Sequence, residues 1–217
     1  MSKIVANPHA PQPDVPPRWT PGEKLLLGAL LAVLVAMHAQ VTQYHGRSLR
    51  GSDGQHYYAA LRSLVFDGDF DYTNEYALTP KPSSLRYRVV QATGRPANKY
   101  GIGWALVAMP AYALTHGAML ALAAAGLASA PNGYELPYQL AATGSHVLAG
   151  WGALAVTWAL SRRWFPRPAA AGALLAVLAG TPLLYYTYDA AYMAHAAAAC
   201  GVAALAWLCV SLAHRPD

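Results

Sequence analysis

Charged side chains are scarce in this sequence: Lys, Arg, Asp and Glu together make up 12% of its 217 residues. Soluble domains usually contain about 25%, so the shortage argues against an ordinary soluble protein. Long apolar runs separated by short polar or basic stretches are instead typical of a multi-pass membrane protein. The basic residues behind the net charge of +5 flank these runs, which indicates topology signals and no nucleic-acid surface.

Cysteine is also rare, since Cys200 and Cys209 are the only two. They lie nine residues apart in one apolar run, and at 100° per residue they point to opposite sides of one helix. They therefore cannot form a disulfide with each other there, and this spacing is not that of a metal site. We interpret both as ordinary apolar core residues.

Five apolar segments predict the fold class, an all-α polytopic membrane protein. Four are long enough to cross about 30 Å of hydrocarbon, and they cover residues 24–41, 137–160, 168–186 and 190–212. The first has a long polar lead and no clear cleavage site, which favours an uncleaved anchor over a cleaved signal peptide.

The fifth segment, 101–128, decides the topology. Basic residues precede the first helix and fill the short 161–168 stretch, and the positive-inside rule places both on the cytoplasmic side. Both basic stretches lie on the cytoplasmic side only if segment 101–128 does not cross the membrane. Pro110, Thr115 and His116 within the segment also favour an interfacial or re-entrant helix, with five full crossings as the alternative.

These segments divide the chain into three parts. Residues 1–23 form a cytoplasmic tail, predicted to be disordered because it is rich in proline and poor in apolar residues. Residues 24–212 form the membrane module, in which 42–100 is a long outer loop. Residues 213–217 are a cytoplasmic end.

The first part of the outer loop has an amphipathic pattern. Apolar residues recur there at helical spacing: Tyr57, Tyr58, Leu61, Leu64 and Val65. The S-x-x-Q stretch 52–55 has the form of a capping box, so Asp53 lies at a helix start just beyond the first membrane helix. Asp53 can simply complement the positive end of that helix, or serve as a general base or metal ligand at the membrane surface.

Three alternating acids follow in the loop, at Asp67, Asp69 and Asp71. The pattern suggests calcium, but an EF-hand loop needs Gly at its sixth position and Glu at its twelfth. Here Tyr72 and Leu78 occupy those positions. We therefore predict a turn that leads into an extended segment.

Basic residues are also dense in the outer loop, which long loops tolerate on either side of a membrane. They are Arg47, Arg50, Arg62, Lys81, Arg86, Arg88, Arg95 and Lys99. Contact with anionic lipid headgroups explains this density, and so does recognition of a phosphate or pyrophosphate. Lys99, just before segment 101–128, is the best placed for the second role.

The connection before the last helix carries two ionisable residues, Asp189 and His195, among several tyrosines. Ionisable groups at a helix end of a membrane protein often mark a functional site, although a single interfacial histidine is as often simply solvated. His146, inside an apolar run, is predicted to make a hydrogen bond between two helices.

Three blocks of the chain together resemble the N-terminal part of GT-C glycosyltransferases. They are SDGQHYYAALRSLVFDGDFDYTNEY, NKYGIGWALVAMPAYALTH and TPLLYYTYDAAYMAH, in the family's order. The nearest resemblance is to bacterial transferases that use polyprenyl-phosphate sugars, of the protein-mannosyltransferase and aminoarabinose-transferase type. It covers roughly residues 24–212.

The resemblance implies transfer of a sugar from an undecaprenyl-phosphate carrier to an acceptor on the periplasmic face of the bacterial inner membrane. Asp53 matches the family's catalytic aspartate, and Lys99 matches the lysine that contacts the lipid phosphate. The predicted substrate-binding residues are Lys99, Arg86, Arg88, His56, Tyr57, His195 and Asp189. Membrane lipids and the sugar-charged carrier are the implied partners.

The chain departs from the family pattern in two ways. Many members carry a pair of acidic residues at the site, whereas Gly54 follows Asp53 here, which leaves open a divalent metal on Asp53 and His195. Members also usually have many more membrane helices. The alternative is therefore a truncated, non-catalytic protein that binds the lipid carrier, or one chain of a split transferase whose second chain supplies the missing helices.

Overall fold

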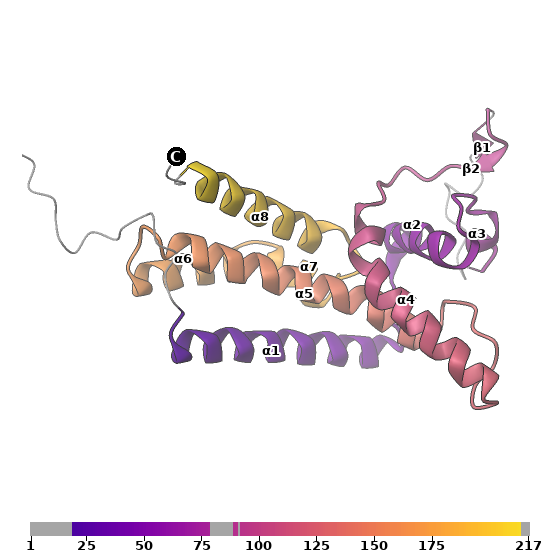
Figure 1. The fold of residues 1–217 in the computed structure, drawn as a ribbon, viewed down its shortest axis with the longest axis horizontal. Helices are drawn as coiled ribbons and strands as arrows, with labels where there is room; N and C mark the ends of the chain where they lie inside the picture. The colour runs from indigo at the N-terminus through magenta and orange to yellow at the C-terminus, as the bar shows by residue number, and fades with distance from the viewer. Residues whose placement is uncertain (1–18, 79–88, 91, 214–217) are drawn as a thin grey trace, which may run out of the picture.

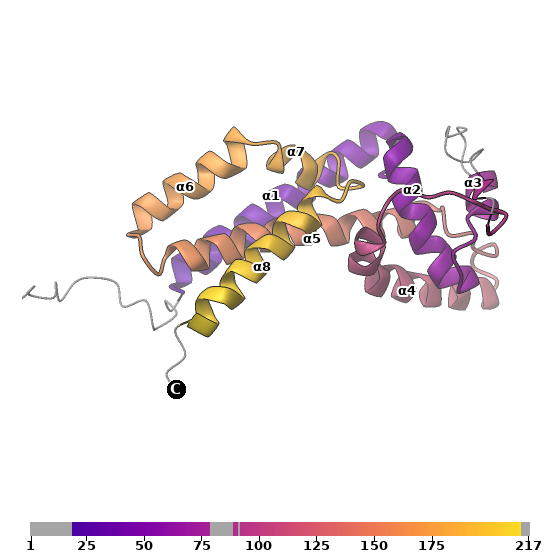
Figure 2. The same cartoon turned by 90° about the horizontal axis from the view of Figure 1, so that it is seen from above.

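A computed structural model describes residues 19–78, 89–90 and 92–213 of the chain (Figure 1). The described part contains eight α-helices, one π-helical turn and a hairpin of two short strands. Four helices, α1, α5, α6 and α8, run lengthwise in a bundle, and α2, α3 and α4 gather at one end of it. Figure 2 shows the same division from above. The predicted helical membrane class is confirmed at this level.

The first helix, α1 (Pro21–His45), begins at a capping box. Thr20 accepts a hydrogen bond from the backbone N–H of Glu23 at 3.3 Å, and the Glu23 carboxylate accepts one in return from the Thr20 N–H at 2.8 Å. The end of the predicted tail, 20–23, is therefore ordered as a cap and first turn. The rest of that tail, apart from Trp19, lies outside the described residues. Gly46, with φ 65°, ends the helix.

Helix α5 (Leu136–Ser161) is the centre of the bundle, and α1, α4, α6, α7 and α8 all contact it. Its buried face includes Val147 and Leu154, which pack with Leu34 of α1. The bundle also contains a polar link, since His38 of α1 hydrogen-bonds Thr143 of α5 at 3.0 Å and the Tyr188 carbonyl at 2.7 Å. Such interhelical bonds satisfy polar groups that lipid cannot.

The predicted single helix over 168–186 is wrong, because the structure breaks it into α6 (Arg167–Gly180) and α7 (Leu183–Tyr188). Pro182 disfavours helical geometry at the residue before it, and Thr181 is extended there, with φ −127° and ψ 166°. The 14 residues of α6 span about 21 Å at about 1.5 Å per residue, less than the hydrocarbon thickness. The last helix, α8, runs over His195–Ala213.

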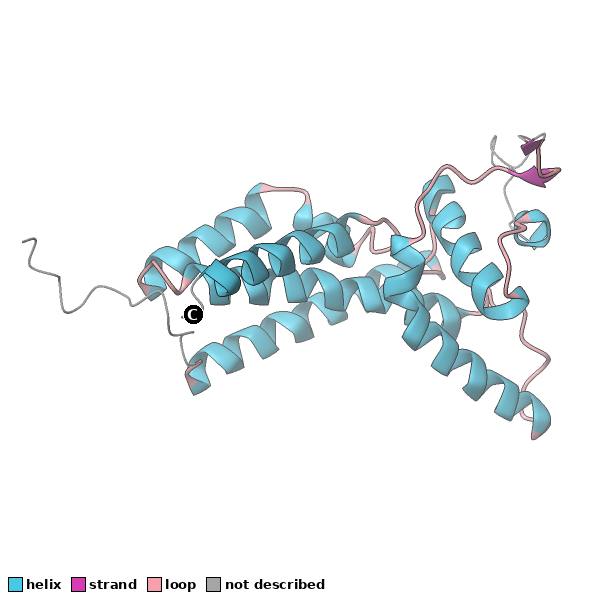
Figure 3. Cartoon of the chain, turned by 45° about the horizontal axis from the view of Figure 1, so that its top comes forward, coloured by secondary structure: helices cyan, strands magenta, loops and turns pink. Residues whose placement is uncertain are grey.

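Three helices of the described chain are long and apolar enough to cross a membrane: α1, α4 (Gly103–Ala124) and α8. Helix α4 lies obliquely to the bundle rather than along it (Figure 3). It packs on the first half of α5, where Trp104 stacks on His146 with ring centroids 4.6 Å apart. His146 also hydrogen-bonds the Trp104 carbonyl at 3.2 Å, which confirms the predicted bond between helices.

The first part of the outer loop is helical, as its amphipathic pattern predicts. The loop as a whole contains α2 (Gly51–Arg62), the π-turn η1 (Ser63–Asp67), α3 (Thr73–Leu78), and the antiparallel strands β1 (Val89–Val90) and β2 (Arg95–Pro96). The predicted capping box at 52–55 is wrong, because α2 starts one residue after Arg50 and has no side-chain cap. Aromatic residues of α2 and α4 form the core of this layer, with Tyr58, Trp104 and Tyr112 buried.

Candidate functional site

Asp53 lies in the first turn of α2, directly after the connection from α1. Its carboxylate is half-buried and accepts hydrogen bonds from the Ser52 hydroxyl, at 3.3 Å, and from the Tyr100 phenol. Burial and this bond raise the pKa of Tyr100, so the phenol stays protonated and remains a donor at neutral pH. The predicted position of Asp53 at a helix start outside the first long helix is confirmed.

Lys99 is brought to the same place by the stretch before α4. Asn98 donates a hydrogen bond to the His56 carbonyl of α2 at 2.9 Å and accepts one from the Tyr100 N–H at 3.1 Å. The exposed Lys99 ammonium lies 4.9 Å from the centre of the Tyr100 ring. Tyr100 thus contacts both the carboxylate and the cation, which are 46 positions apart in sequence.

An open apolar pocket of about 330 Å³ lies beside this group, between the start of α4 and the start of α8. Tyr57 and Trp104 form one side of it, and small residues in and just before α8 form the other: Ala194, Ala197 and Ala198. The Tyr57 ring also packs on the Tyr100 ring, with centroids 4.5 Å apart. The arrangement places a carboxylate and a nearby ammonium next to a space suited to an apolar chain.

The turn between α7 and α8 holds the start of α2 in position. Arg50 forms an ion pair with Asp189 at 3.1 Å and lies over the Tyr192 ring, 5.3 Å from its centre. Gly54 packs so closely on Tyr192 that an added Cβ would lie 2.7 Å from its ring. The same Gly54 that departs from the family pattern therefore allows this close contact.

The other predicted binding residues have mixed placements. Tyr57 lines the pocket. His56 is only 1% exposed, and its ring packs against the Tyr100 ring with centroids 5.6 Å apart. Asp189 is engaged by Arg50. His195 is exposed and stacks on Tyr186, with centroids 3.9 Å apart. The remaining two, Arg86 and Arg88, lie outside the described residues.

A divalent metal does not fit the donors that the described residues provide. They contain no group of three His, Cys, Asp or Glu side chains that could hold an ion. Asp53 accepts its bonds from Tyr100 and Ser52, and His195 is stacked on Tyr186.

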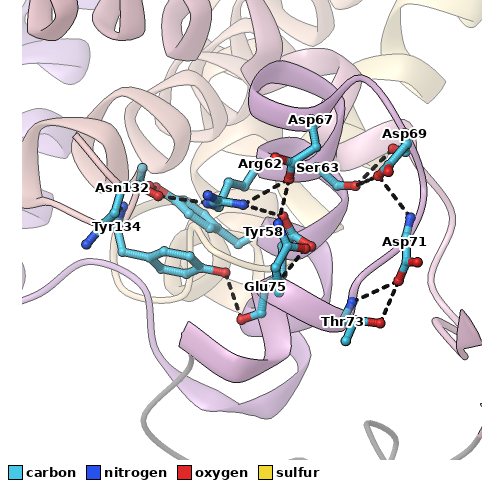
Figure 4. Close-up of polar contacts among 12 residues, drawn as sticks. Tyr58, Arg62, Ser63, Asp67, Asp69, Asp71, Thr73, Glu75, Asn132 and Tyr134 are labelled. Carbon is cyan, nitrogen blue, oxygen red and sulfur yellow. Dashed lines mark hydrogen bonds and ion pairs between the residues drawn. The ribbon is translucent and has the colours of Figure 1, made fainter. Parts of the chain in front are cut away.

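A buried acid–base cluster braces the outer loop (Figure 4) and was not predicted from the sequence. One nitrogen of Arg62, Nη1, donates to both Glu75, at 2.5 Å, and Asp67, at 3.0 Å. The Glu75 side chain is fully buried. One positive charge thus faces two carboxyl groups, and two carboxylates so placed cannot easily both be ionised.

The pKa values of the two carboxyl groups in this cluster are shifted in opposite directions. Burial and a hydrogen bond to Asp67 raise the pKa of Glu75 to about 7. For Asp67, burial acts in the raising direction, but hydrogen bonds from Asn74 and Glu75 and the charge of Arg62 leave its pKa lowered overall. Below about pH 7 the shared proton therefore stays on Glu75, and the Glu75 carboxylic acid donates a hydrogen bond to the Asp67 carboxylate.

The cluster ties three segments together. Arg62 Nε donates to the Asn132 carbonyl at 2.7 Å, in the turn between α4 and α5. Next to Glu75, the Tyr76 ring packs on His56, with centroids 5.3 Å apart, and the Tyr76 hydroxyl donates to the Ala97 carbonyl at 3.4 Å. Protonated Glu75 is thereby connected, through α3, to the stretch that carries Lys99 and Tyr100.

A signal for this cluster exists in the sequence. Arg62 follows Tyr58 by four residues, so the helical pattern places a charge on the buried face of α2, and a buried charge requires a partner. Its partner Glu75 is 13 positions away, beyond any helical spacing, and only the turn of the chain at 67–72 brings it back. The sequence therefore predicts that Arg62 is buried and needs an acidic partner, but it does not predict that Glu75 is this partner.

The alternating acids form a turn, as predicted. Asp69 Oδ1 accepts from the Ser63 hydroxyl at 2.8 Å and from the Asp71 N–H at 3.0 Å, and Asp71 Oδ1 accepts from the Thr73 N–H at 3.1 Å. The predicted extended segment after the turn is wrong over 73–78, because the Asp71 cap starts helix α3 there.

Comparisons with protein families, with curated proteins and with solved structures find no match to this chain. Its function is therefore argued from the site.

Proposed function

We propose that the protein is a membrane glycosyltransferase, or the N-terminal catalytic portion of one. It transfers a sugar from an undecaprenyl-phosphate carrier to an acceptor hydroxyl on the periplasmic face of a bacterial inner membrane. The observation that carries the proposal is the arrangement of Asp53, Tyr100 and Lys99 beside an apolar pocket, just beyond the first long helix. It provides a base, a cation for a phosphate, and space for a lipid chain.

The proposed reaction uses these groups in one displacement. Asp53 accepts the proton of the acceptor hydroxyl while the acceptor oxygen forms a bond to the anomeric carbon of the sugar. The bond from that carbon to the phosphate oxygen breaks, and polyprenyl phosphate leaves with the electron pair. Lys99 stabilises the charge that develops on the phosphate, and Tyr100 holds the Asp53 carboxylate by its hydrogen bond.

The orientation of the chain in the membrane follows from the same proposal. The start of α1 and the basic 161–167 turn face the cytoplasm, and α2, α3 and the start of α4 face the periplasm. Two observations support this arrangement: the two basic stretches lie at one end of the bundle, and the outer-loop helices lie at the other (Figure 1).

The first test is sugar transfer by the full chain in membranes supplied with radiolabelled undecaprenyl-phosphate hexoses. Asp53→Asn keeps the shape and the hydrogen-bond acceptor but is a far weaker base, so transfer is expected to fall by at least about 10²-fold. Arg95→Gln is the matched control, because Arg95 is an exposed charged residue of the same loop. Equal transfer by Asp53→Asn and wild type would remove Asp53 from the mechanism.

The same experiment separates the alternative function. If the wild-type chain is inserted and folded but transfers no sugar, binding of the radiolabelled carrier decides. Carrier binding that falls in Lys99→Gln and persists in Asp53→Asn identifies a non-catalytic carrier-binding protein or one chain of a split transferase. Absence of both transfer and binding would contradict both proposals.

A further inference from the structure

A buried arginine at the other end of the bundle has no acidic partner in the part of the chain that the structure describes. Arg163 follows α5 and is only 5% exposed. Its guanidinium lies over the Trp207 ring of α8, 4.5 Å from the centre, and donates one hydrogen bond, to the Ser211 hydroxyl at 3.3 Å. Its Nε is buried without a hydrogen-bond partner, and no ion pair within the described chain includes it.

The neighbouring basic residues differ in this respect. Arg162 and Arg167 both pair with Glu23 of α1, each at 3.3 Å. Glu23 is therefore already shared by two arginines, and among the described residues no carboxylate pairs with Arg163. A charge held away from water is costly unless an opposite charge accompanies it, so the structure calls for an anion here.

An apolar groove lies next to this arginine. It has a volume of about 590 Å³ and is formed by α5, by α8 and by Trp19 before α1. Ala155 and Ala159 form its floor on α5, and Trp207, the residue under the Arg163 guanidinium, is part of its wall. An apolar groove with a cation beside its wall suits a molecule with a hydrocarbon tail and an anionic head.

We propose that this groove and Arg163 form a binding site for an anionic phospholipid. The acyl chains occupy the groove and the phosphate pairs with Arg163, since basic pockets between membrane helices bind anionic headgroups in this way. A zwitterionic lipid supplies no net negative charge, and a free phosphate leaves the apolar groove empty. The groove lies toward the end of the bundle away from α2, the helix that carries Asp53 (Figure 1), and it does not depend on the proposed sugar transfer.

The test is lipid retention by the purified full chain, measured by native mass spectrometry. The protein is offered phosphatidylglycerol and phosphatidylcholine with identical acyl chains in equal amounts. Wild type is expected to retain one phosphatidylglycerol in preference, and Arg163→Gln is expected to lower that preference by about tenfold or more. Arg162→Gln is the matched control in the same turn and keeps the preference, because Arg162 is already paired with Glu23.

A second variant keeps the proposal testable if Arg163→Gln does not fold. Ala204→Phe fills the groove wall on α8 and leaves Arg163 in place, so it is expected to lose the retained lipid as well. Retention of both lipids equally by wild type, or an unchanged preference in a folded Arg163→Gln or Ala204→Phe protein, would overturn the proposal. Thermal stabilisation by inorganic phosphate equal to that by phosphatidylglycerol would overturn its lipid part.

Discussion

At the scale of single residues, Tyr100 positions the carboxylate of Asp53, the candidate base. It donates to the Asp53 carboxylate, its ring lies under the Lys99 ammonium, and it packs against Tyr57 at the pocket wall. A carboxylate that accepts a hydrogen bond from a half-buried phenol is restrained in orientation, which proton transfer requires. The role of Tyr100 is therefore positioning, and it can be separated from that of Asp53.

We expect Tyr100→Phe to lower sugar transfer by about ten- to a hundredfold, the usual effect of losing a hydrogen bond to a charged group. The ring packing is kept, so the KM for the carrier is expected to change much less than kcat. Both constants are measured in the transfer assay. Tyr44→Phe, at an exposed tyrosine near the end of α1, is the control, and an equal loss in both variants would contradict the positioning role.

At the scale of elements, the Arg62 cluster determines how α2, α3 and the 132–135 turn are held together. It forms a polar centre between segments that are also joined by aromatic packing and by tyrosine hydrogen bonds. Because Glu75 is protonated in the folded state at a pH where it is ionised in the unfolded chain, the strength of this brace depends on pH.

The sign of this dependence follows from the raised pKa of Glu75. Between its usual value of 4.5 and about 7, the folded protein binds more protons than the unfolded chain. The stabilising contribution is complete below pH 4.5 and is lost as the pH rises through 7. The pKa values of Asp67 and Asp71 are lowered from 3.8, so their contribution is lost only at more acidic pH.

We expect Glu75→Gln to flatten the pH dependence of stability between about pH 4.5 and 7, because glutamine resembles the protonated acid. The difference across this window is on the order of 2–3 kcal/mol. The measurement is thermal unfolding in detergent, together with hydrogen exchange of the α3 amides. Asp71→Asn is the control: it removes an acidic group of the same loop whose pKa is lowered from 3.8, so it is expected to retain the slope between pH 4.5 and 7.

At the scale of the whole molecule, the oblique α4 determines the topology. The helix is 22 residues long and apolar enough to cross, yet it lies across the end of the bundle with the outer-loop helices (Figure 3). Polar bonds hold the middle of α4 against the start of α5 and the turn before it, since His116 contacts the Tyr138 hydroxyl at 2.8 Å and Tyr112 donates to the Gly133 carbonyl at 2.9 Å. We propose that α4 lies at the periplasmic interface and that the chain crosses four times, with α6 and α7 together making one of the crossings.

Single cysteines test this topology in a background with Cys200 and Cys209 replaced by alanine. An interfacial α4 leaves Ala92→Cys and Ser129→Cys on the same side, and Phe165→Cys on the opposite side. All three positions are exposed, so a membrane-impermeant thiol reagent added to cells or to inverted vesicles distinguishes the sides. Labelling of Ala92→Cys and Ser129→Cys from opposite sides would show that α4 crosses.

The sequence by itself determined the elements whose causes are local. Apolar length predicts α1 and α8, and the amphipathic stripe predicts α2. The position of Asp53 at a helix start follows from α2 directly. The resemblance to GT-C transferases stays a proposal, since it depends on the order of three blocks and on residues that only an assay can test.

Only the tertiary structure decided which distant residues meet. Arg62 pairs with Glu75, and Tyr100 bonds Asp53, because turns bring separate segments of the chain together. No periodic pattern in the sequence predicts such pairs. The break at Pro182 and the solitary charge of Arg163 likewise depend on what surrounds them. Local patterns record which face of a helix is apolar, whereas pairing of charges depends on the path of the chain in space.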